Sequence, residues 1–335
     1  MNTPFTVGKY ERGDAEKVER RVVSLLRGEM VEEDDLTRIA RSIYEKVRED
    51  YPDVSGAEHI GNRYAEPGDV RLTLNDGAHA FLEIKVVSSG KGTRANLGQD
   101  SLTEWGLFEE GTLSWSAFRG TRGHQERVLQ ILESYGSYPS RCDGSTSQRL
   151  VCMASQLKEL VGPLPGESVE KAARRLHGGA QRAAEVVNEV VEFDREVKLQ
   201  YLSYLRGRRQ VPENVRKFTV AILAGYHSRR AMGIAWRNFD QLIGALRNYR
   251  VYYAYKGTEK VVSENLSEKV LDLLGREMRV LFRDGETNVA LGFVDRGREV
   301  PVLRVVLHWK NLFQGIKTPC LNVFDEEFLL TQERL

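Results

Sequence analysis

The 335-residue sequence contains little cysteine, no long apolar run and no large excess of either charge. Its three cysteines, Cys142, Cys152 and Cys320, lack the close paired spacing of a zinc ribbon or a disulfide framework. We therefore expect reduced thiols and a cytoplasmic location. The first residues lack the apolar centre of a signal peptide, and no run approaches membrane-spanning length, so no membrane partner is expected.

Several motifs of nucleotide-binding proteins and hydrolases are also missing. In the glycine-rich segment 88–99 no Gly-Lys pair precedes Ser or Thr, which argues against a P-loop and against a nucleotide cofactor. The six histidines show no His-Glu-x-x-His spacing, and no serine or cysteine lies in a nucleophile elbow. No carboxylate spacing supports His124 as a catalytic base, so we expect it at the surface or against a phosphate.

What is present is the composition of an ordinary globular protein. Hydrophobic residues make up 41% and charged residues 29%, and the length allows one large core or two smaller ones. Apolar residues at helical spacing predict helices near residues 14–26, 36–47 and 169–205, whereas alternation predicts strands between residues 249 and 308.

The polar, turn-rich segment 137–150 is the best candidate for a boundary between structural units. We predict N-terminal helices and a hairpin core over residues 1–150, followed by a basic helical region over residues 151–250. Residues 251–335 are rich in predicted strands, which we expect to complete the sheet of the hairpin. The predicted class is α/β, with a central mixed sheet, flanking helices and a helical insertion.

The most informative stretch is a predicted hairpin between residues 69 and 87. Polar and apolar residues alternate on both sides of Asn75-Asp76-Gly77, which is a strong hairpin-turn signal. Glu83 and Lys85 are two residues apart, so they project from the same face of their strand, and Asp69 begins the paired strand.

Two carboxylates and an ammonium beside an apolar hairpin suit a divalent cation, because oxygen ligands are those that Mg2+ prefers. The alternative is an edge hairpin with solvated charges.

The sequence here resembles a known family. Pro67-Gly68-Asp69, followed after thirteen residues by Glu83-Ile84-Lys85, is similar to the motif of the PD-(D/E)xK nuclease superfamily, which includes Type II restriction endonucleases. The resemblance implies that Asp69, Glu83 and the backbone carbonyl of Ile84 hold Mg2+, and that Lys85 orients the attacking water.

A helix before the hairpin sometimes adds an acidic ligand in that family, and Glu45 and Glu49 are the candidates by position; a solvated helix face is the alternative. A second Glu-x-Lys, Glu196-Val197-Lys198, lies in a helical pattern without a hairpin and is not assigned to the site.

Residues on two glycine-containing segments are candidates for contacts with a DNA backbone, because exposed amides, hydroxyls and cations suit phosphate. The first segment could equally be a flexible connection. The candidates are Lys91, Thr93, Arg94, Asn96, Gln99, Arg119 and Arg122.

Positive charge is concentrated between Tyr201 and Arg250, where ten cations face only two acidic residues. Nine of the ten are arginines, whose guanidinium fork matches phosphate and guanine edges. We predict that this region contacts DNA, with Arg208, Arg209, Arg229, Arg230 and Arg237 as candidates. The alternative is that these arginines pair with the acidic helix around Glu185, Glu189, Glu192 and Asp194.

The sequence-based expectation is therefore a Mg2+-dependent, sequence-specific endonuclease of double-stranded DNA, acting as a homodimer. The resemblance implies cleavage that leaves a 5′-phosphate and a 3′-hydroxyl. Two alternatives remain: a nuclease of the same superfamily in DNA repair or phage defence, and a DNA-binding protein without catalysis.

Overall fold

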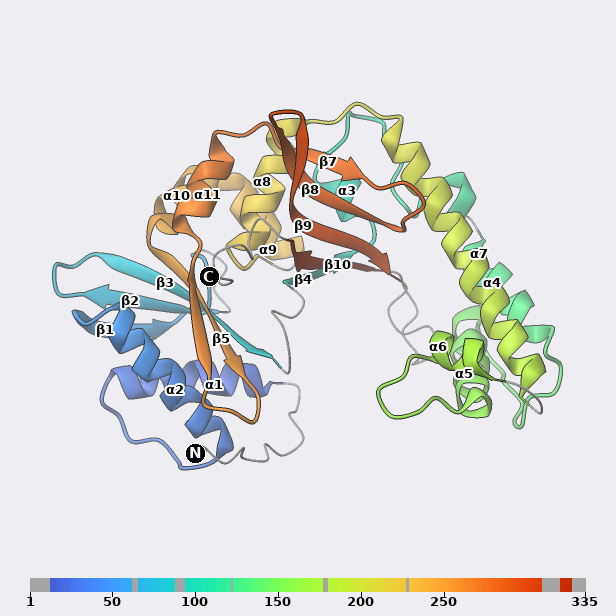
Figure 1. Ribbon diagram of the computed structural model, residues 1–335, viewed down its shortest axis with the longest axis horizontal. Helices are drawn as coiled ribbons and strands as arrows, with labels where there is room; N and C mark the ends of the chain where they lie inside the picture. Colours follow the sequence, from blue (N-terminus) through green and yellow to red (C-terminus); the bar gives the residue numbers. More distant parts are fainter. Residues whose placement is uncertain are drawn as a thin grey trace.

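The chain has an α/β fold built on two five-stranded sheets, as seen in the computed structural model (Figure 1). The structure describes residues 13–61, 66–87, 94–121, 123–176, 180–226, 229–308 and 320–326. The predicted α/β class is confirmed. A mixed sheet flanked by helices is present, but most of the C-terminal strands that were expected to complete it form a sheet of their own.

The first sheet contains the predicted hairpin and is mixed. Its order is β1 (Val54–His59), β2 (Val70–Leu74), β3 (His79–Val87), β5 (Tyr249–Tyr255) and β6 (Val261–Asn265). β3 and β5 are parallel, and the other neighbours are antiparallel. A parallel pair needs a crossover, and the chain between β3 and β5 contains β4 and every helix from α3 to α10.

Two N-terminal helices, α1 (Asp14–Leu26) and α2 (Asp35–Asp50), cover one face of this sheet. Their apolar residues recur at helical spacing, and α2 starts where the side chain of Asp34 accepts a hydrogen bond from Thr37 N. They pack on the even-numbered side chains of β3, which include Leu82 and Ile84. The odd-numbered side chains, including Glu83 and Lys85, therefore belong to the opposite face.

That opposite face packs on a second helical layer, formed by α8 (Pro212–Leu223), α9 (Arg229–Arg237), α10 (Phe239–Ala245), the short helix η2 (Leu246–Asn248) and α11 (Ser267–Leu274). Tyr249, Val251 and Tyr253 of β5 belong to the same core cluster. Figure 1 shows α8, α9 and α10 close together beside the first sheet. The first sheet is thus enclosed between two helical layers.

The second sheet is antiparallel throughout. Its order is β4 (Ala95–Gly98), β10 (Cys320–Asp325), β9 (Arg298–His308), β8 (Asn288–Asp295) and β7 (Arg279–Phe282). Contrary to the expectation from the sequence, strands β7 to β10 therefore do not complete the first sheet. Of the strands after α10 that the structure describes, β5 and β6 join it. The short helices α3 (Ser101–Glu104) and η1 (Arg119–Thr121) follow β4.

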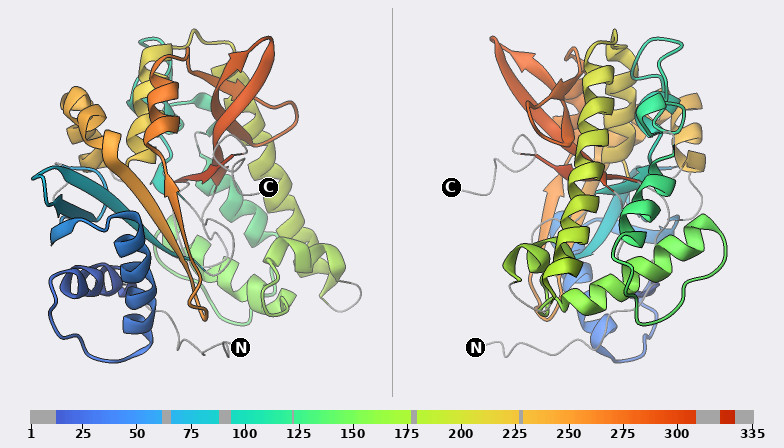
Figure 2. Two further views of the ribbon diagram at one scale, coloured as in Figure 1. Left: turned by 60° about the vertical axis from the view of Figure 1, so that its left-hand side comes forward. Right: turned by 90° about the vertical axis from the view of Figure 1, so that its right-hand side faces the viewer.

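A separate helical unit has its own core. It consists of α4 (His124–Glu133), α5 (Thr146–Val161), α6 (Val169–Arg175) and the first half of α7 (Gln181–Arg206). The second half of α7 packs in the main core through Val197, Tyr201 and Leu205, so this helix joins the two parts (Figure 2). The predicted boundary at residue 150 falls inside α5, and the unit begins earlier, at α4.

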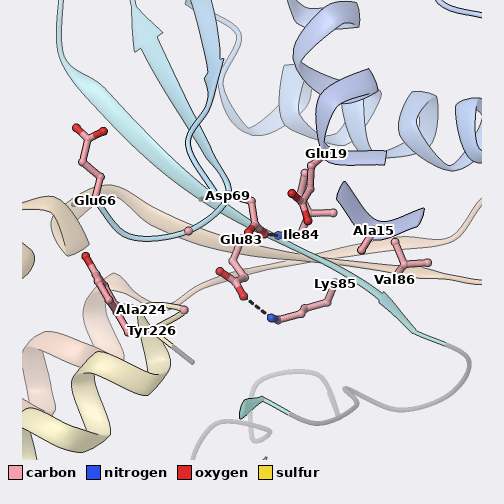
Figure 3. A pocket seen from close by; sticks show the side chains of 13 residues that line it. Ala15, Glu19, Glu66, Asp69, Glu83, Ile84, Lys85, Val86, Ala224 and Tyr226 are labelled. Atoms are coloured by element: carbon pink, nitrogen blue, oxygen red, sulfur yellow. Dashed lines mark hydrogen bonds and ion pairs between the residues drawn. The ribbon is translucent and has the colours of Figure 1, made fainter. Parts of the chain in front are cut away.

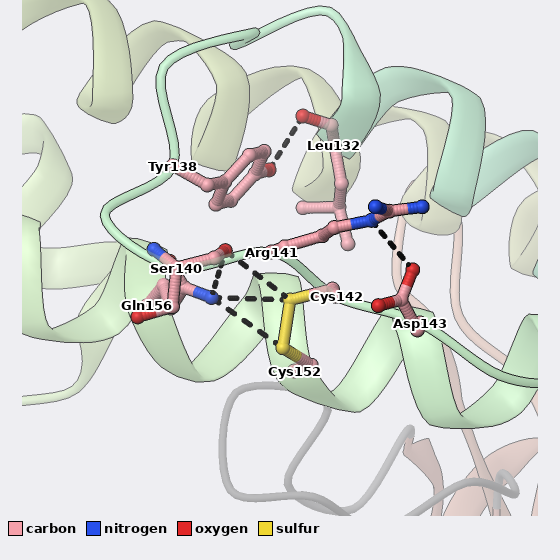
Figure 4. The surroundings of a disulfide bond; sticks show 8 residues. All are labelled: Leu132, Tyr138, Ser140, Arg141, Cys142, Asp143, Cys152 and Gln156. Atoms are coloured by element: carbon pink, nitrogen blue, oxygen red, sulfur yellow. Dashed lines mark hydrogen bonds and ion pairs between the residues drawn. A yellow bond between two sulfur atoms is a disulfide. The ribbon is translucent and has the colours of Figure 1, made fainter.

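The helical unit also contains a disulfide between Cys142 and Cys152 (Figure 4), which corrects the expectation of reduced thiols. Cys142 precedes α5, and the chain folds back so that the two Cα atoms are 5.7 Å apart. Gln156 Nε2 lies 3.1 Å from the sulfur of Cys142. A separation of ten residues gives no spacing signal, because the contact arises from the turn before α5. Cys320 is free and buried.

The disulfide removes the cysteine-based argument for a reducing compartment. As for the membrane, none of the helices in the described ranges has the length and apolar character needed to cross a bilayer.

Candidate active site

The segment Gly68-Asp69 is held between two strands at the start of β2. Asp69 N donates to Leu82 O of β3 at 2.7 Å, and Asp69 O accepts from Ile60 N at 2.8 Å and from Gly61 N at 3.1 Å. Gly68 has φ +76°, and a Cβ there would lie 2.8 Å from the carbonyl carbon of Leu82. Only glycine fits at this position, and it fixes the backbone that presents Asp69.

Asp69, Glu83 and Lys85 line one pocket of about 410 Å³, so the structure brings together the three residues that the sequence placed in the site (Figure 3). Glu83 is only 2% exposed and forms an ion pair with Lys85 Nζ. Asp69 Oδ2 accepts a hydrogen bond from Ile84 N at 2.8 Å. The two carboxylates therefore approach from neighbouring strands, with Lys85 beside them.

A third carboxylate, Glu19 of α1, lines the same pocket and was not predicted. It is 8% exposed, and its Oε2 lies 2.8 Å from Nε2 of His59. Glu19 Oε2 and Asp69 Oδ1 lie 3.4 Å and 3.3 Å from the point where a Cβ on Gly61 would stand. The only sequence signal for Glu19 is its place next to the apolar Val18 and Val22, which fixes the side of α1 on which it lies.

Glu45 and Glu49, the acidic candidates from the sequence, do not line the pocket. Both are exposed on α2, where Glu49 pairs with Lys46 at 2.9 Å. The apolar side of α2, with Ile43 and Val47, faces the sheet and directs these two carboxylates to solvent. The helix that supplies an acidic group to the pocket is α1 rather than α2.

The pocket has more negative charge than its one lysine offsets. Burial raises the pKa of Asp69 well above its usual value, and repulsion from Glu83 and Glu19 raises it further, while Lys85 and the N–H of Ile84 act in the opposite direction. Burial also raises the pKa of Glu19, despite its hydrogen bond to His59. A bound cation would remove this repulsion.

The turn after α8 packs closely against Glu83. Ala224, Gly225 and Tyr226 line the pocket, and Gly225 has φ +86°. A Cβ on Gly225 would clash with Glu83 Oε2 and lie 3.2 Å from its Cδ. Glycine therefore lets the backbone of this turn pack closely against the carboxylate.

These residues fit a metal with oxygen ligands. Asp69 Oδ1, the carboxylate of Glu83 and the Ile84 carbonyl are the candidates. Leu82 O and Ile84 N both bond to Asp69, so the even-numbered residues of β3 direct their peptide groups toward β2. The Ile84 carbonyl is therefore directed past the start of β2. Across the described ranges, no three His, Cys, Asp or Glu side chains form a metal-binding group, so such a site would use two carboxylates, the carbonyl and water.

Most of the predicted DNA-contact residues that the structure describes are exposed or line a surface pocket. Asn96 is exposed and Gln99 half-buried, and both line a pocket with Arg229. The arginines that are exposed are Arg119, Arg208, Arg209, Arg229, Arg230 and Arg237. Lys91, Thr93 and Arg122 lie outside the described residues.

Two residues expected at the surface are buried instead. Arg94 is 4% exposed and donates to both carboxylate oxygens of Asp325 at 2.9 Å and to Tyr253 OH at 2.8 Å. Its guanidinium links the two sheets and is not presented to a phosphate. His124 is also 4% exposed, and its Nε2 lies 3.2 Å from Asp194 Oδ1.

Comparison with known proteins identifies no family for this chain. The sequence matches no family model, and neither a curated protein nor a solved structure matches it. Its function must be inferred from the chemistry of the pocket.

Proposed function

We propose that this protein is a Mg2+-dependent endonuclease that hydrolyses phosphodiester bonds in double-stranded DNA. One observation carries the proposal: Asp69, Glu83 and Lys85 converge on one pocket, where burial and, after it, repulsion from Glu83 and Glu19 raise the pKa of Asp69. A stable fold gains nothing from such repulsion, which makes a functional role the better account.

Asp69 Oδ1, Glu83 and the Ile84 carbonyl would hold the cation. When bound, Mg2+ supplies a water of lowered pKa and neutralises charge that develops at phosphorus. Asp69 is fixed by three backbone hydrogen bonds and a fourth to its Oδ2, so its free oxygen keeps one orientation. Lys85 Nζ pairs with Glu83, and its remaining hydrogens would be available to a water or a phosphate oxygen bound in the pocket.

The DNA contacts are assigned to the exposed arginines of α8–α10 and the segments that adjoin them, above all Arg208, Arg209, Arg229, Arg230 and Arg237. Sequence-specific cleavage by a homodimer, leaving a 5′-phosphate and a 3′-hydroxyl, is the Type II form of this activity. It is proposed here because of the motif resemblance. A homodimer would place one pocket on each strand of a symmetric site.

The test is digestion of a long unmethylated duplex with Mg2+ and with EDTA. Discrete bands that require Mg2+ are expected from the wild type, and no product from Asp69→Ala, Glu83→Ala or Lys85→Ala at unchanged DNA affinity. Glu196→Ala, which changes the helical copy of the motif, should cut normally.

Near-normal cutting by one pocket variant would remove that residue from the mechanism. Smeared or junction-dependent products would instead indicate a nuclease of repair or defence. Salt-sensitive binding without any Mg2+-dependent product would identify a DNA-binding protein and refute the proposal.

A further inference from the structure

Helix α9 contributes residues to two surface pockets. Arg229, Gly233 and Arg237 lie four residues apart on one side of this helix. Arg229 lines a pocket of about 340 Å³ together with Asn96, Gln99 and Trp105. Arg237 lines a second pocket, of about 490 Å³. We call Trp105, Lys217, Arg229, Trp236, Arg237 and Phe239 the α9 strip.

Two tryptophans join the two surface pockets. Trp105 lines the first and Trp236 the second, and their ring centroids are 5.3 Å apart with an interplanar angle of 42°. The two rings are in contact and tilted rather than stacked. Arg237 Nη1 and Trp105 Cη2 lie 3.7 Å and 3.8 Å from the position of a Cβ on Gly233. The missing side chain of Gly233 therefore lets the guanidinium and the indole meet on the helix.

The α9 strip begins next to the active site. Tyr226 lines the active-site pocket and precedes Arg229 by three residues, a span of at most about 11 Å. From Arg229 to Arg237 the helix rises about 12 Å. The strip thus extends over a length that several nucleotides of one DNA strand would cover.

The chemistry of the strip matches an unpaired strand better than a closed duplex. Trp105, Trp236 and Phe239 are half-buried, so part of each ring is open to solvent. A duplex hides the faces of its bases, whereas an unpaired base stacks on such rings. Lys217 Nζ already lies 5.5 Å from the ring centroid of Phe239, so Trp236 is the better candidate for stacking with a base.

Positive charge accompanies the rings. Arg229 pairs with Glu104, and Lys217 lies 3.7 Å from Glu213. Arg237 is exposed and, within the part of the chain that the structure describes, forms no ion pair. Its guanidinium is placed to bind a phosphate next to a base stacked on Trp236.

We propose that the α9 strip binds an unpaired DNA strand that adjoins the cleavage site, with a base on Trp236 and a phosphate on Arg237. This inference rests on the proposed nuclease function and adds a DNA contact to it: beside the duplex that is cut, the strip would hold nucleotides that are unpaired next to the cleavage site. It assigns the two surface pockets to the strand that leaves the active site.

The experiment measures binding by fluorescence anisotropy in EDTA, so that it does not depend on cleavage. One probe is a blunt duplex, and the other is the same duplex with a six-nucleotide tail that carries 2-aminopurine. We expect the tailed probe to bind about tenfold more tightly than the blunt one, with quenching of 2-aminopurine, because stacking on one ring is worth about that much.

Variants assign the effect to individual side chains. Trp236→Leu keeps apolar volume but should lose the tail preference and the quenching, whereas Trp236→Phe keeps both. Arg237→Ala should weaken binding and lower the slope of log affinity against log salt by about one. Arg174→Ala removes an exposed arginine of the helical unit and should change nothing. Thermal melting checks that each variant is folded.

The outcomes separate this inference from the nuclease proposal. Glu83→Ala should keep the tail preference, since the strip does not need the metal site. Equal affinity for blunt and tailed probes would overturn the inference, and so would an intact preference of folded Trp236→Leu for the tailed probe. Neither result would contradict the nuclease proposal. Competition by polyglutamate as strong as by the unlabelled tail would also overturn the inference, by identifying a docking site for acidic protein.

Discussion

The tripeptide Glu-x-Lys occurs in two regions of this molecule, and its Glu and Lys side chains form an ion pair with each other in only one of them. In β3, Glu83 and Lys85 form an ion pair inside the pocket that also contains Asp69. In α7, Glu196 is exposed and accepts a hydrogen bond from Gln200 at 3.1 Å. Lys198 of that copy is buried and pairs with Asp194, four residues earlier in the helix.

The difference follows from the period of each backbone. Side chains two residues apart share a face in a strand but diverge by about 200° around a helix. The strand therefore keeps the carboxylate and the ammonium together, and the helix separates them. The comparison teaches that this tripeptide takes its chemistry from the element in which it lies.

The largest expected effect comes from the same substitution in both copies. Lys85→Met should reduce Mg2+-dependent cleavage about 100-fold or more, since it removes a cation from the reacting centre. Lys198→Met should cut normally when folded. It should instead lower the free energy of unfolding by about 2–3 kcal/mol, because the half-buried Asp194 loses its ammonium partner and, among the described residues, keeps an ion pair with His124 alone.

Cleavage rates at saturating DNA and urea denaturation measure the two effects. If Lys198→Met lost cleavage while keeping its stability, the helical copy would have a catalytic role and the contrast would fail.

A smaller loss of cleavage is expected when Glu83 is displaced. It tests whether the position of Glu83 makes the strand copy of Glu-x-Lys catalytic. In Gly225→Ala the new Cβ clashes with Glu83 Oε2, so the carboxylate must move and cleavage should fall about tenfold to 100-fold. Gly77→Ala is the matched control, because Gly77 has a similar φ of +82° with no atom within 4 Å of a Cβ. Both variants share the backbone strain, but only the first displaces Glu83.

Equal cleavage by folded Gly225→Ala and Gly77→Ala would show that cleavage does not depend on the observed position of Glu83.

The smallest effect concerns stability against pH in the metal-free protein. Burial, with repulsion from Glu83 and Glu19, raises the folded-state pKa of Asp69, so the folded state holds this proton more tightly than the unfolded state. Stability therefore falls as pH rises from about 4, the usual value of an aspartate, through the folded pKa. The melting temperature should be higher at pH 5 than at pH 8.

Asp69→Asn should remove part of that difference and raise the melting temperature at pH 8, while Mg2+ should stabilise the wild type more than the variant. Asp284→Asn changes an exposed carboxylate that pairs with Arg206 and serves as the control. A lower melting temperature for Asp69→Asn at pH 8 would mean that the charge of Asp69 stabilises the fold.

Local sequence was enough to predict the hairpin and three members of the site. Asn75-Asp76-Gly77 forms the turn between β2 and β3, with Gly77 at positive φ, as its residue types require. Strand alternation then places Glu83 and Lys85 on one face. The helical copy of the motif was predicted on the same basis, because α7 has apolar residues at helical spacing.

The remaining features depend on contacts between distant segments. Glu19 reaches the pocket because α1 packs beside β3, and Gly225 because α8 ends there. Arg94 and Arg237 look alike in sequence, yet Arg94 is neutralised by Asp325, 231 residues away. The second sheet and the Cys142–Cys152 disulfide arise in the same way.

By itself, then, the sequence determined which segments form helices and strands and which side chains share a face, since both follow from backbone periods of a few residues. Only the tertiary structure decided which charged groups meet, which arginines remain at the surface and where the active-site pocket opens. The physical reason is that burial and charge pairing depend on how whole helices and strands pack. This packing brings together residues that are far apart in the chain, so no repeating sequence pattern predicts it.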